Sequence, residues 1–331
     1  MQSADFDEDL YKNWFRRPTL FVACAWFLLA VAGRILVRAA LGELALLAQR
    51  YLGVDARAQV PAAVEIVFQM GVLALPVLRY MLRHPGVEQS MRVRAPHPVV
   101  AGYAAGLAVA AVPLCSCLTG WWTLLIRSAG GSVQDTTAVP LGAAALCIAL
   151  LLKALLPGVC EELMFRGGIM GAWERRGTER ALVISTLAFA ALHGSVQGLP
   201  VQLLMGFSLG WLVIESDSLW TGVIFHVAFN GATVALSSLL GVDMDLHIYA
   251  ITAPGPATTL LIADTVAAGA LFGLMLIGLK ALCGRLVTRM DGPKQLDLTP
   301  LEPHELVVLL AGALTAAVCY MEDILRVCGV L

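Results

Sequence analysis

Pro157-Gly-Val-Cys-Glu161-Glu162-Leu-Met-Phe-Arg166-Gly-Gly-Ile-Met-Gly171 is the stretch that decides how this chain is interpreted. It follows the apolar run Leu141–Leu156 without a break, so its charges stand where the hydrocarbon of a bilayer is expected. One ionised side chain at that depth costs about 2.5–3.5 kcal/mol on insertion scales. Two adjacent glutamates and an arginine are therefore unsuited to a helix that only spans a membrane, and they predict a buried polar site.

The composition places the whole chain in a membrane. Of its 331 residues, 59% are hydrophobic and 14% are charged, and the charged share is well below the usual value of about 25% for soluble domains. No basic stripe with interleaved aromatic residues is present, which argues against a nucleic-acid partner. We therefore expect an all-α, polytopic helix bundle in the lipid bilayer, formed by residues 1–331 as a single membrane domain.

Apolar runs of about twenty residues predict eight to nine transmembrane helices. The candidate segments are 19–48, 60–82, 99–126, 140–173, 180–194, 200–214, 218–240, 258–284 and 305–323. The first contains Arg34, Arg38 and Glu43, so we expect its second half to follow the membrane interface or a polar cavity. Whether 305–323 spans the membrane is left open by the sequence. Residues 140–240 are expected to form the catalytic core, around an intramembrane cavity.

Lysine and arginine in the connections predict the orientation. If nine helices cross the membrane in alternating directions, every strongly basic connection lies on one side of the membrane. The connection after 218–240, with Asp243 and Asp245, lies on the other side. The basic residues are Lys12, Arg16, Arg17, Arg79, Arg83, Arg92, Arg94, Arg175, Arg176, Arg180, Lys280, Arg285, Arg289 and Lys294. The positive-inside rule then puts the N-terminus in the cytoplasm. The composition and short loops favour a prokaryotic cytoplasmic membrane.

Two further apolar segments carry polar groups, namely His193 in the fifth and His226 with Asn230 in the seventh. At about 1.5 Å per helical residue, Glu161 lies roughly 21 Å from Arg175 and His193 roughly 20 Å from Arg180. On the same rise, His226 and Asn230 lie roughly 12 and 18 Å from the start of their segment. In a core about 30 Å thick, all four fall in the middle band. Three helices therefore offer polar groups to one buried site.

The spacings suggest what each group does. Glu162 and Arg166 are i,i+4 neighbours and can pair, which leaves Glu161, turned about 100° away, free for chemistry. His226 and Asn230 are also i,i+4 and can point at one spot, where they could donate to an oxyanion. His193 can bond the free carboxylate or its water. Together these groups predict a centre that activates water to hydrolyse an amide.

The order Glu-Glu-x-x-x-Arg, Phe-x-x-x-His and His-x-x-x-Asn, within Cys160–Gly231, resembles the CPBP family of intramembrane proteases. This family contains the type II CAAX prenyl endopeptidases and the prokaryotic Abi proteins. The resemblance implies that Glu161 and His193 activate water, that His226 and Asn230 hold the oxyanion, and that Glu162 and Arg166 support the site. It also implies a conical cavity, and processing of C-termini in maturation or protein sorting.

Two other functions stay open at this point. Glu161, His193 and His226 could instead bind zinc with water as the fourth ligand, although no His-Glu-x-x-His is present. A transporter or scaffold could use the charges for ion coupling, although no inverted repeat is apparent. The expectation is an intramembrane endopeptidase with no obligatory cofactor, zinc being the alternative. Its substrate is a membrane-embedded protein or peptide, which is cleaved near its C-terminus while membrane-anchored or lipidated.

Overall fold

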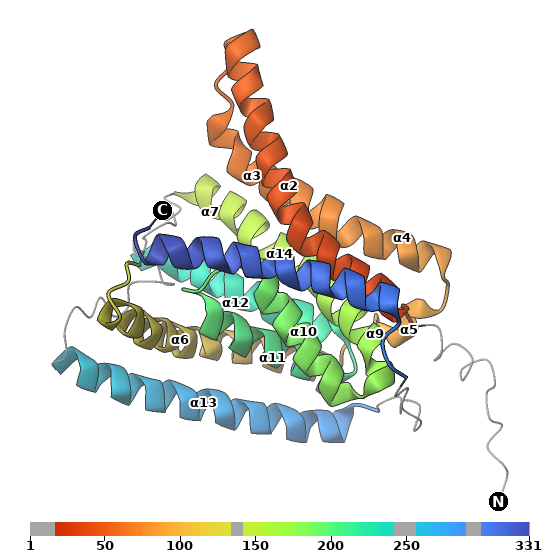
Figure 1. Ribbon diagram of the computed structural model, residues 1–331. Helices are drawn as coiled ribbons and strands as arrows, with labels where there is room; N and C mark the ends of the chain where they lie inside the picture. The colour runs from red at the N-terminus through yellow and green to blue at the C-terminus, as the bar shows by residue number, and fades with distance from the viewer. Residues whose placement is uncertain (1–16, 134–141, 241–255, 289–298, 331) are drawn as a thin grey trace, which may run out of the picture.

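The computed structural model describes residues 17–133, 142–240, 256–288 and 299–330 and is helical throughout, with no strand among these residues (Figure 1). The elements are η1 (Arg57–Gln59), α2 (Leu20–Leu52), α3 (Val60–Ile66), η2 (Val67–Ala74), α4 (Leu75–Arg83), α5 (Val87–Ser90), α6 (Pro98–Ser128), α7 (Ala143–Ala149), η3 (Leu150–Leu155), α8 (Leu156–Glu162), η4 (Leu163–Met170), α9 (Gly171–Trp173), η5 (Glu174–Arg176), α10 (Thr178–His193), α11 (Leu199–Ser216), α12 (Leu219–Leu240), α13 (Pro256–Leu286) and α14 (Pro303–Val327).

The described helices confirm a polytopic membrane bundle. Eight helical stretches are long and apolar enough to cross a membrane, including α14, which the sequence left open. Of the nine predicted segments, only 180–194 falls short of this length, because α10 has 16 residues. At about 1.5 Å per residue, α10 is about 24 Å long, somewhat less than a hydrocarbon core of about 30 Å. α10 therefore ends inside the bundle, and its last residue is His193.

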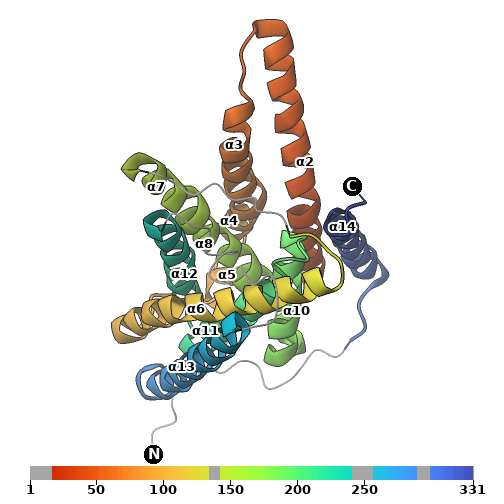
Figure 2. The same cartoon turned by 90° about the vertical axis from the view of Figure 1, so that its left-hand side faces the viewer.

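α13 packs on α6 and α14 packs on α2; α6, α13 and α14 run across the view of Figure 1, whereas α2 rises steeply away from them (Figures 1 and 2). α12 lies against α6, α8 and α11, and α10 lies against α11. The second half of α2 and α3 stand out from the bundle as a hairpin. The segments that carry the predicted site residues are thus neighbours in the middle of the fold.

Two glycines allow α12 to approach the glutamate motif. A Cβ atom at Gly158 would lie 2.5 Å from the Val227 side chain and 3.1 Å from the Val227 backbone nitrogen. At Gly222 it would lie 3.1 Å from Oε2 of Glu162. Only glycine fits such close approaches without moving a helix. The two positions therefore set the distance between α8 and α12, and with it the distance between Glu162 and His226.

Three stretches have π-helical hydrogen bonding, namely η2, η3 and η4. Pro157 follows η3 directly after Leu156 and carries no N–H, so it cannot donate to the carbonyl of Lys153 in an α-helical pattern. Pro76 stands in the same relation to the carbonyl of Val72 in η2. The two prolines thus account for the departures from α-helical hydrogen bonding in η2 and η3. Such π segments are frequent at functional sites.

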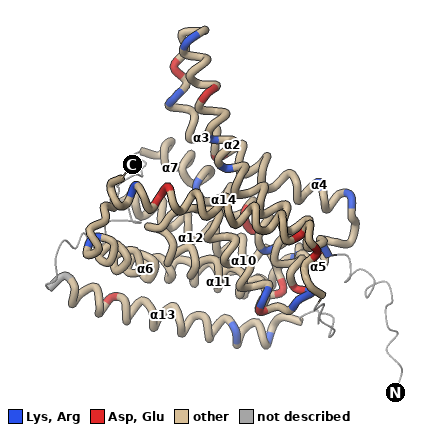
Figure 3. Tube along the Cα trace, in the orientation of Figure 1, with Lys and Arg blue, Asp and Glu red and all other residues tan. Residues whose placement is uncertain are grey.

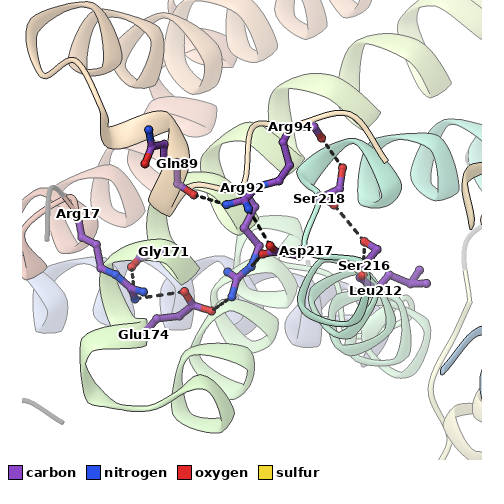
Figure 4. Close-up of polar contacts among 10 residues, drawn as sticks. All are labelled: Arg17, Gln89, Arg92, Arg94, Gly171, Glu174, Leu212, Ser216, Asp217 and Ser218. Carbon is purple, nitrogen blue, oxygen red and sulfur yellow. Dashed lines mark hydrogen bonds and ion pairs between the residues drawn. The ribbon is translucent and has the colours of Figure 1, made fainter. Parts of the chain in front are cut away.

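A group of paired charges, which we call the end network, gathers at one end of the bundle (Figures 3 and 4). Glu174 contacts Arg17 at 3.2 Å and Arg92 at 2.7 Å. Asp217 contacts Arg92 at 3.0 Å and Arg94 at 2.7 Å. Burial lowers the pKa of Arg17 to about 10, while Glu174 opposes this shift. These contacts join the start of α2 to the connections before α6, after η4 and between α11 and α12.

The end network confirms that several basic connections share one end of the molecule, as the alternation of segments predicted. Which end faces the cytoplasm stays a prediction. Lys12, Arg16, Asp243, Asp245, Arg289 and Lys294, on which part of that prediction rested, lie outside the described residues. Lys280 and Arg285 were assigned to a connection, but both belong to α13, which continues to Leu286.

Candidate active site

The predicted pair between Glu162 and Arg166 is present, and it extends to a third residue. Nη1 of Arg166 donates to Oε1 of Glu162 at 2.8 Å, and both side chains are fully buried. Nδ1 of His226 lies 2.9 Å from the same oxygen. Since an ionised carboxylate only accepts, Nδ1 carries the hydrogen and Nε2 of His226 is left for other contacts. Glu162 therefore fixes the imidazole as well as the arginine, which the sequence did not predict.

Phe189 lies among these groups and packs as expected. The guanidinium of Arg166 sits 4.3 Å from the centre of the Phe189 ring, a distance typical of a cation–π contact. The same ring lies 4.8 Å from the His193 ring and 6.0 Å from the His226 ring. Arg166 also donates to the carbonyl of Gly206 at 3.0 Å. Phe189 thus spaces the two histidines apart within one buried cluster.

Glu161 is buried and uses a different partner from its neighbour. Nε2 of Gln69 donates to Oε1 of Glu161 at 2.7 Å and to Oε1 of Glu65 at 2.9 Å. The amide group of Gln69 has two hydrogens, so one serves each carboxylate. Within the described part of the chain, Glu161 forms no ion pair, and Oε1 of Gln69 is buried without a partner. Glu161 is therefore held in place by an amide donor and not by a salt bridge.

Gln69 and Glu65 were missed by the sequence analysis. The available signal was a carboxylate and an amide at i,i+4 in an apolar segment, a spacing that puts both on one helix face. Glu65 is on α3 and Gln69 is on η2, so a second transmembrane segment supports the glutamate motif. An intramembrane ionisable residue is a functional candidate by default, and Glu65 met that condition.

His193 ends α10 at the edge of the buried cluster. Its Nδ1 lies 2.9 Å from the carbonyl oxygen of Phe189 in its own helix. A carbonyl only accepts, so Nδ1 carries the hydrogen and Nε2 of the neutral ring is free to accept a proton. This ring and the His226 ring both pack against Phe189, and the charge of Glu161 acts on the His193 ring. The structure therefore brings His193, Glu161 and His226 into one neighbourhood, as the matched depths predicted.

Asn230 lies on the same helix as His226, one turn further along, and its contact differs from the expected one. Nδ2 of Asn230 donates to the carbonyl of Lys153 at 2.9 Å. This is the carbonyl that Pro157 leaves without an α-helical donor. One amide hydrogen is thus used to tie α12 to η3, and the second remains for another acceptor. No hydrogen bond links Asn230 to Glu161, His193 or His226 among the described contacts.

A cavity of about 810 Å³ opens beside His193, between α2, the end of α10 and the last turns of α14. Arg34 and Arg38 line it from α2, which confirms the expected polar cavity along the second half of that segment. Nη1 of Arg34 donates to the carbonyl of Leu192 at 3.1 Å, next to His193. Among the described residues, no group of three or more His, Cys, Asp or Glu is arranged to hold a metal ion.

Two comparisons with known proteins give matches. Residues 143–232 match the family described as type II CAAX prenyl endopeptidase Rce1-like. The chain is also 24% identical over 108 residues to "Putative membrane peptidase YdiL" of Bacillus subtilis (strain 168). These 108 residues are 32% of this chain and 44% of that protein. The match thus spans less than half the length of that relative. No solved structure matches the chain.

The matched region 143–232 runs from α7 into α12 and contains all three motifs on which the resemblance was based. Over this region the chain is therefore similar to the family of type II CAAX prenyl endopeptidases.

Proposed function

We propose that the chain is an intramembrane endopeptidase that cleaves a peptide bond near the C-terminus of a membrane-anchored or lipidated protein or peptide. The observation that carries this proposal is the separation of the two adjacent glutamates. Glu162 is hydrogen-bonded to Arg166 and His226, whereas Glu161 has only an amide donor, from Gln69. A buried ion pair that served stability alone would not need the second carboxylate, because an unpaired buried charge is costly.

In the proposed reaction, Glu161 and Nε2 of His193 bind a water molecule, and Glu161 takes one of its protons as the oxygen attacks the scissile carbonyl carbon. A tetrahedral oxyanion forms. The protonated Glu161 then gives its proton to the leaving nitrogen as the C–N bond breaks, which restores the carboxylate. Water thus supplies the hydroxyl of the new carboxyl group and the hydrogen of the new amine.

His226 and Asn230 are proposed to stabilise the oxyanion. Nδ1 of His226 is committed to Glu162, so donation from Nε2 requires the imidazolium form. Asn230 would contribute the Nδ2 hydrogen that Lys153 does not use. Donors of this kind are typically worth a factor of about 10²–10³ in rate.

The test is mass spectrometry of membrane-protein termini in cells that produce wild-type protein or the Glu161→Ala variant. We expect specific C-terminal fragments to disappear in the variant while the variant still accumulates. Glu179→Ala is the matched control, because Glu179 is an exposed carboxylate in the first turn of α10. Identical terminal profiles for wild type and Glu161→Ala would argue for a transporter or scaffold instead.

The proposed location is a prokaryotic cytoplasmic membrane, with the N-terminus and the end network on the cytoplasmic side. The paired arginines of the end network supply the positive charge that the positive-inside rule associates with that side. Reporter fusions after Arg94 and after Gly131, at the two ends of α6, test this orientation. We expect cytoplasmic reporter activity for the fusion after Arg94 only.

A further inference from the structure

The cavity beside His193 is lined by four cations and three anions, and two of the cations form no ion pair among the described residues. Its charged lining residues are Arg34, Arg38, Glu43, Arg57, Glu322, Asp323 and Arg326. Four of them have local partners. Arg57 pairs with Asp55 at 3.0 Å, Arg326 pairs with Glu322, and Asp323 accepts from the backbone N–H of Val196 at 2.7 Å. The remaining cations are Arg34 and Arg38.

Arg34 and Arg38 stand one turn apart on α2 and both line the cavity. Like charges at i,i+4 repel each other and destabilise a helix. Neither guanidinium forms an ion pair within the described residues, and Arg34 donates to the neutral carbonyl of Leu192. Placing two arginines on one face of an apolar helix thus has a cost that no ion pair among the described residues offsets.

Arg34 lies directly beside the proposed catalytic groups. Its contact to Leu192 is one residue from His193, and its charge acts on both His193 and Glu65. Arg34 stands fourteen residues after Leu20, so it is about 21 Å along α2 from the end that carries the end network. This depth suits a buried segment of a peptide better than the headgroup of a phospholipid, which lies at the membrane surface.

We propose that Arg34 and Arg38 form a binding site for a carboxylate of the substrate, next to the scissile bond. A planar guanidinium matches a carboxylate with two parallel hydrogen bonds, and two of them one turn apart offer such bonds along the cavity wall. The carboxylate belongs either to the free C-terminus or to an acidic side chain of the peptide. This identification of the ligand as substrate rests on the proposed protease function.

The probe is a fluorescent apolar hexapeptide, prepared with a free C-terminal acid, with a C-terminal amide, and as an amide that carries one internal glutamate. Its binding to the full chain in neutral phosphatidylcholine nanodiscs is measured by fluorescence anisotropy. We expect at least one acidic peptide to bind about tenfold more tightly than the plain amide, as a charge-assisted hydrogen bond predicts. If the peptide with the free C-terminal acid binds more tightly, the site recognises a C-terminus. If the peptide with the internal glutamate binds more tightly, the site recognises an acidic side chain.

The variants locate this preference and separate it from catalysis. Arg38→Gln should abolish the preference for acidic peptides. Arg50→Gln should retain it, because Arg50 stacks on Tyr51 near the end of α2 and does not line the cavity. The Glu161→Ala protein should also retain it, because peptide binding does not require cleavage. The binding experiment can therefore be interpreted even if the terminal-profile experiment contradicts the protease function.

Equal binding of all three peptides to the wild-type chain, or no binding of any, would overturn the proposal. So would a preference that survives in Arg38→Gln. A preference abolished by adding anionic phosphatidylglycerol to the nanodisc would assign the arginines to a lipid phosphate, and would also overturn it.

Discussion

The end network and the glutamate motif are both buried clusters of charge, and they are built differently. In the end network, two carboxylates meet three guanidinium groups, and every one of these charges has an opposite partner. In the glutamate motif, Glu161 has an amide for a partner and forms no ion pair among the described residues. The first arrangement joins connections. The second leaves acceptors available, as a site for water and substrate requires.

The two clusters also differ in how they relate to the backbone. Among the described residues, Arg92 and Asp217 are the non-glycine residues with a left-handed backbone conformation, at φ values of 54° and 48°. They contact each other at 3.0 Å. The end network therefore stabilises two strained turns. Near the glutamate motif the corresponding irregularity is π-helical, in η2, η3 and η4.

The largest difference in stability is expected for the cations of the two clusters. Arg166→Met leaves Glu162 buried with His226 alone and should cost about 3–5 kcal/mol, as for other broken buried pairs. Arg94→Met should cost about 1 kcal/mol, because the Arg94 side chain is 29% exposed and Asp217 keeps Arg92. Unfolding in bicelles by steric trapping measures both values. Similar costs for the two variants would remove the distinction between the clusters.

A double variant sharpens this comparison. Glu162→Leu combined with Arg166→Met removes both charges and should cost less than Arg166→Met alone, because no unpaired charge remains. If the double variant were as unstable as the sum of the single ones, the two residues would not act as a pair.

Activity should depend on the two histidines by a factor of about 10²–10⁴ in kcat for each. His193→Ala removes the acceptor next to Glu161, and His226→Ala removes the proposed oxyanion donor. Both are assayed on a peptide taken from the terminal-profile experiment. His97→Ala is the control, since His97 caps the exposed start of α6. Near-normal kcat for either active-site variant would remove that residue from the mechanism.

Gln69→Leu should lower kcat by about 10- to 100-fold with little change in Tm, because small misplacements of a catalytic group have effects of this order. The change removes the donor to Glu161 without adding a charge. Gln49→Leu, at an exposed position of α2, serves as the matched control. A change in KM alone would show that Gln69 contacts substrate rather than positioning Glu161.

The smallest effect is expected as a difference between two variants of Asp217. Asp217→Ala removes two ion pairs and should cost about 1–2 kcal/mol of stability while kcat stays unchanged. Asp217→Gly loses the same pairs but suits the left-handed backbone, so it should be more stable than the alanine variant by several tenths of a kcal/mol. Thermal unfolding in detergent compares the two. A loss of activity in either would connect the end network to the site.

Much of this architecture was predictable because apolar length and charge placement act over a single helix. The nine segments, the Glu162–Arg166 pair and the convergence of Glu161, His193 and His226 follow from helix rise and spacing. The shared end of the basic connections follows from alternation. These features require no knowledge of which helices touch.

The remaining features depend on helix contacts and on local pairing. Gln69 reaches Glu161 across 92 positions of sequence, and no spacing rule identifies such a partner. Asn230 finds the Lys153 carbonyl because Pro157 leaves it without an α-helical donor, a consequence that appears only once α12 packs on η3. His226 bonds Glu162 because Gly158 and Gly222 let the helices approach.

The most direct test of the central claim is the rate of peptide cleavage by purified wild-type and Glu161→Gln protein after dialysis against a chelator, with metal content measured in parallel. The account predicts that wild type stays active without bound metal, and that Glu161→Gln loses at least about a thousandfold in kcat at an unchanged Tm, since Gln69 can still bond the amide oxygen. Loss of wild-type activity on chelation, restored by zinc, would support the zinc alternative with Glu161, His193 and His226 as ligands. Full activity of Glu161→Gln would contradict the account.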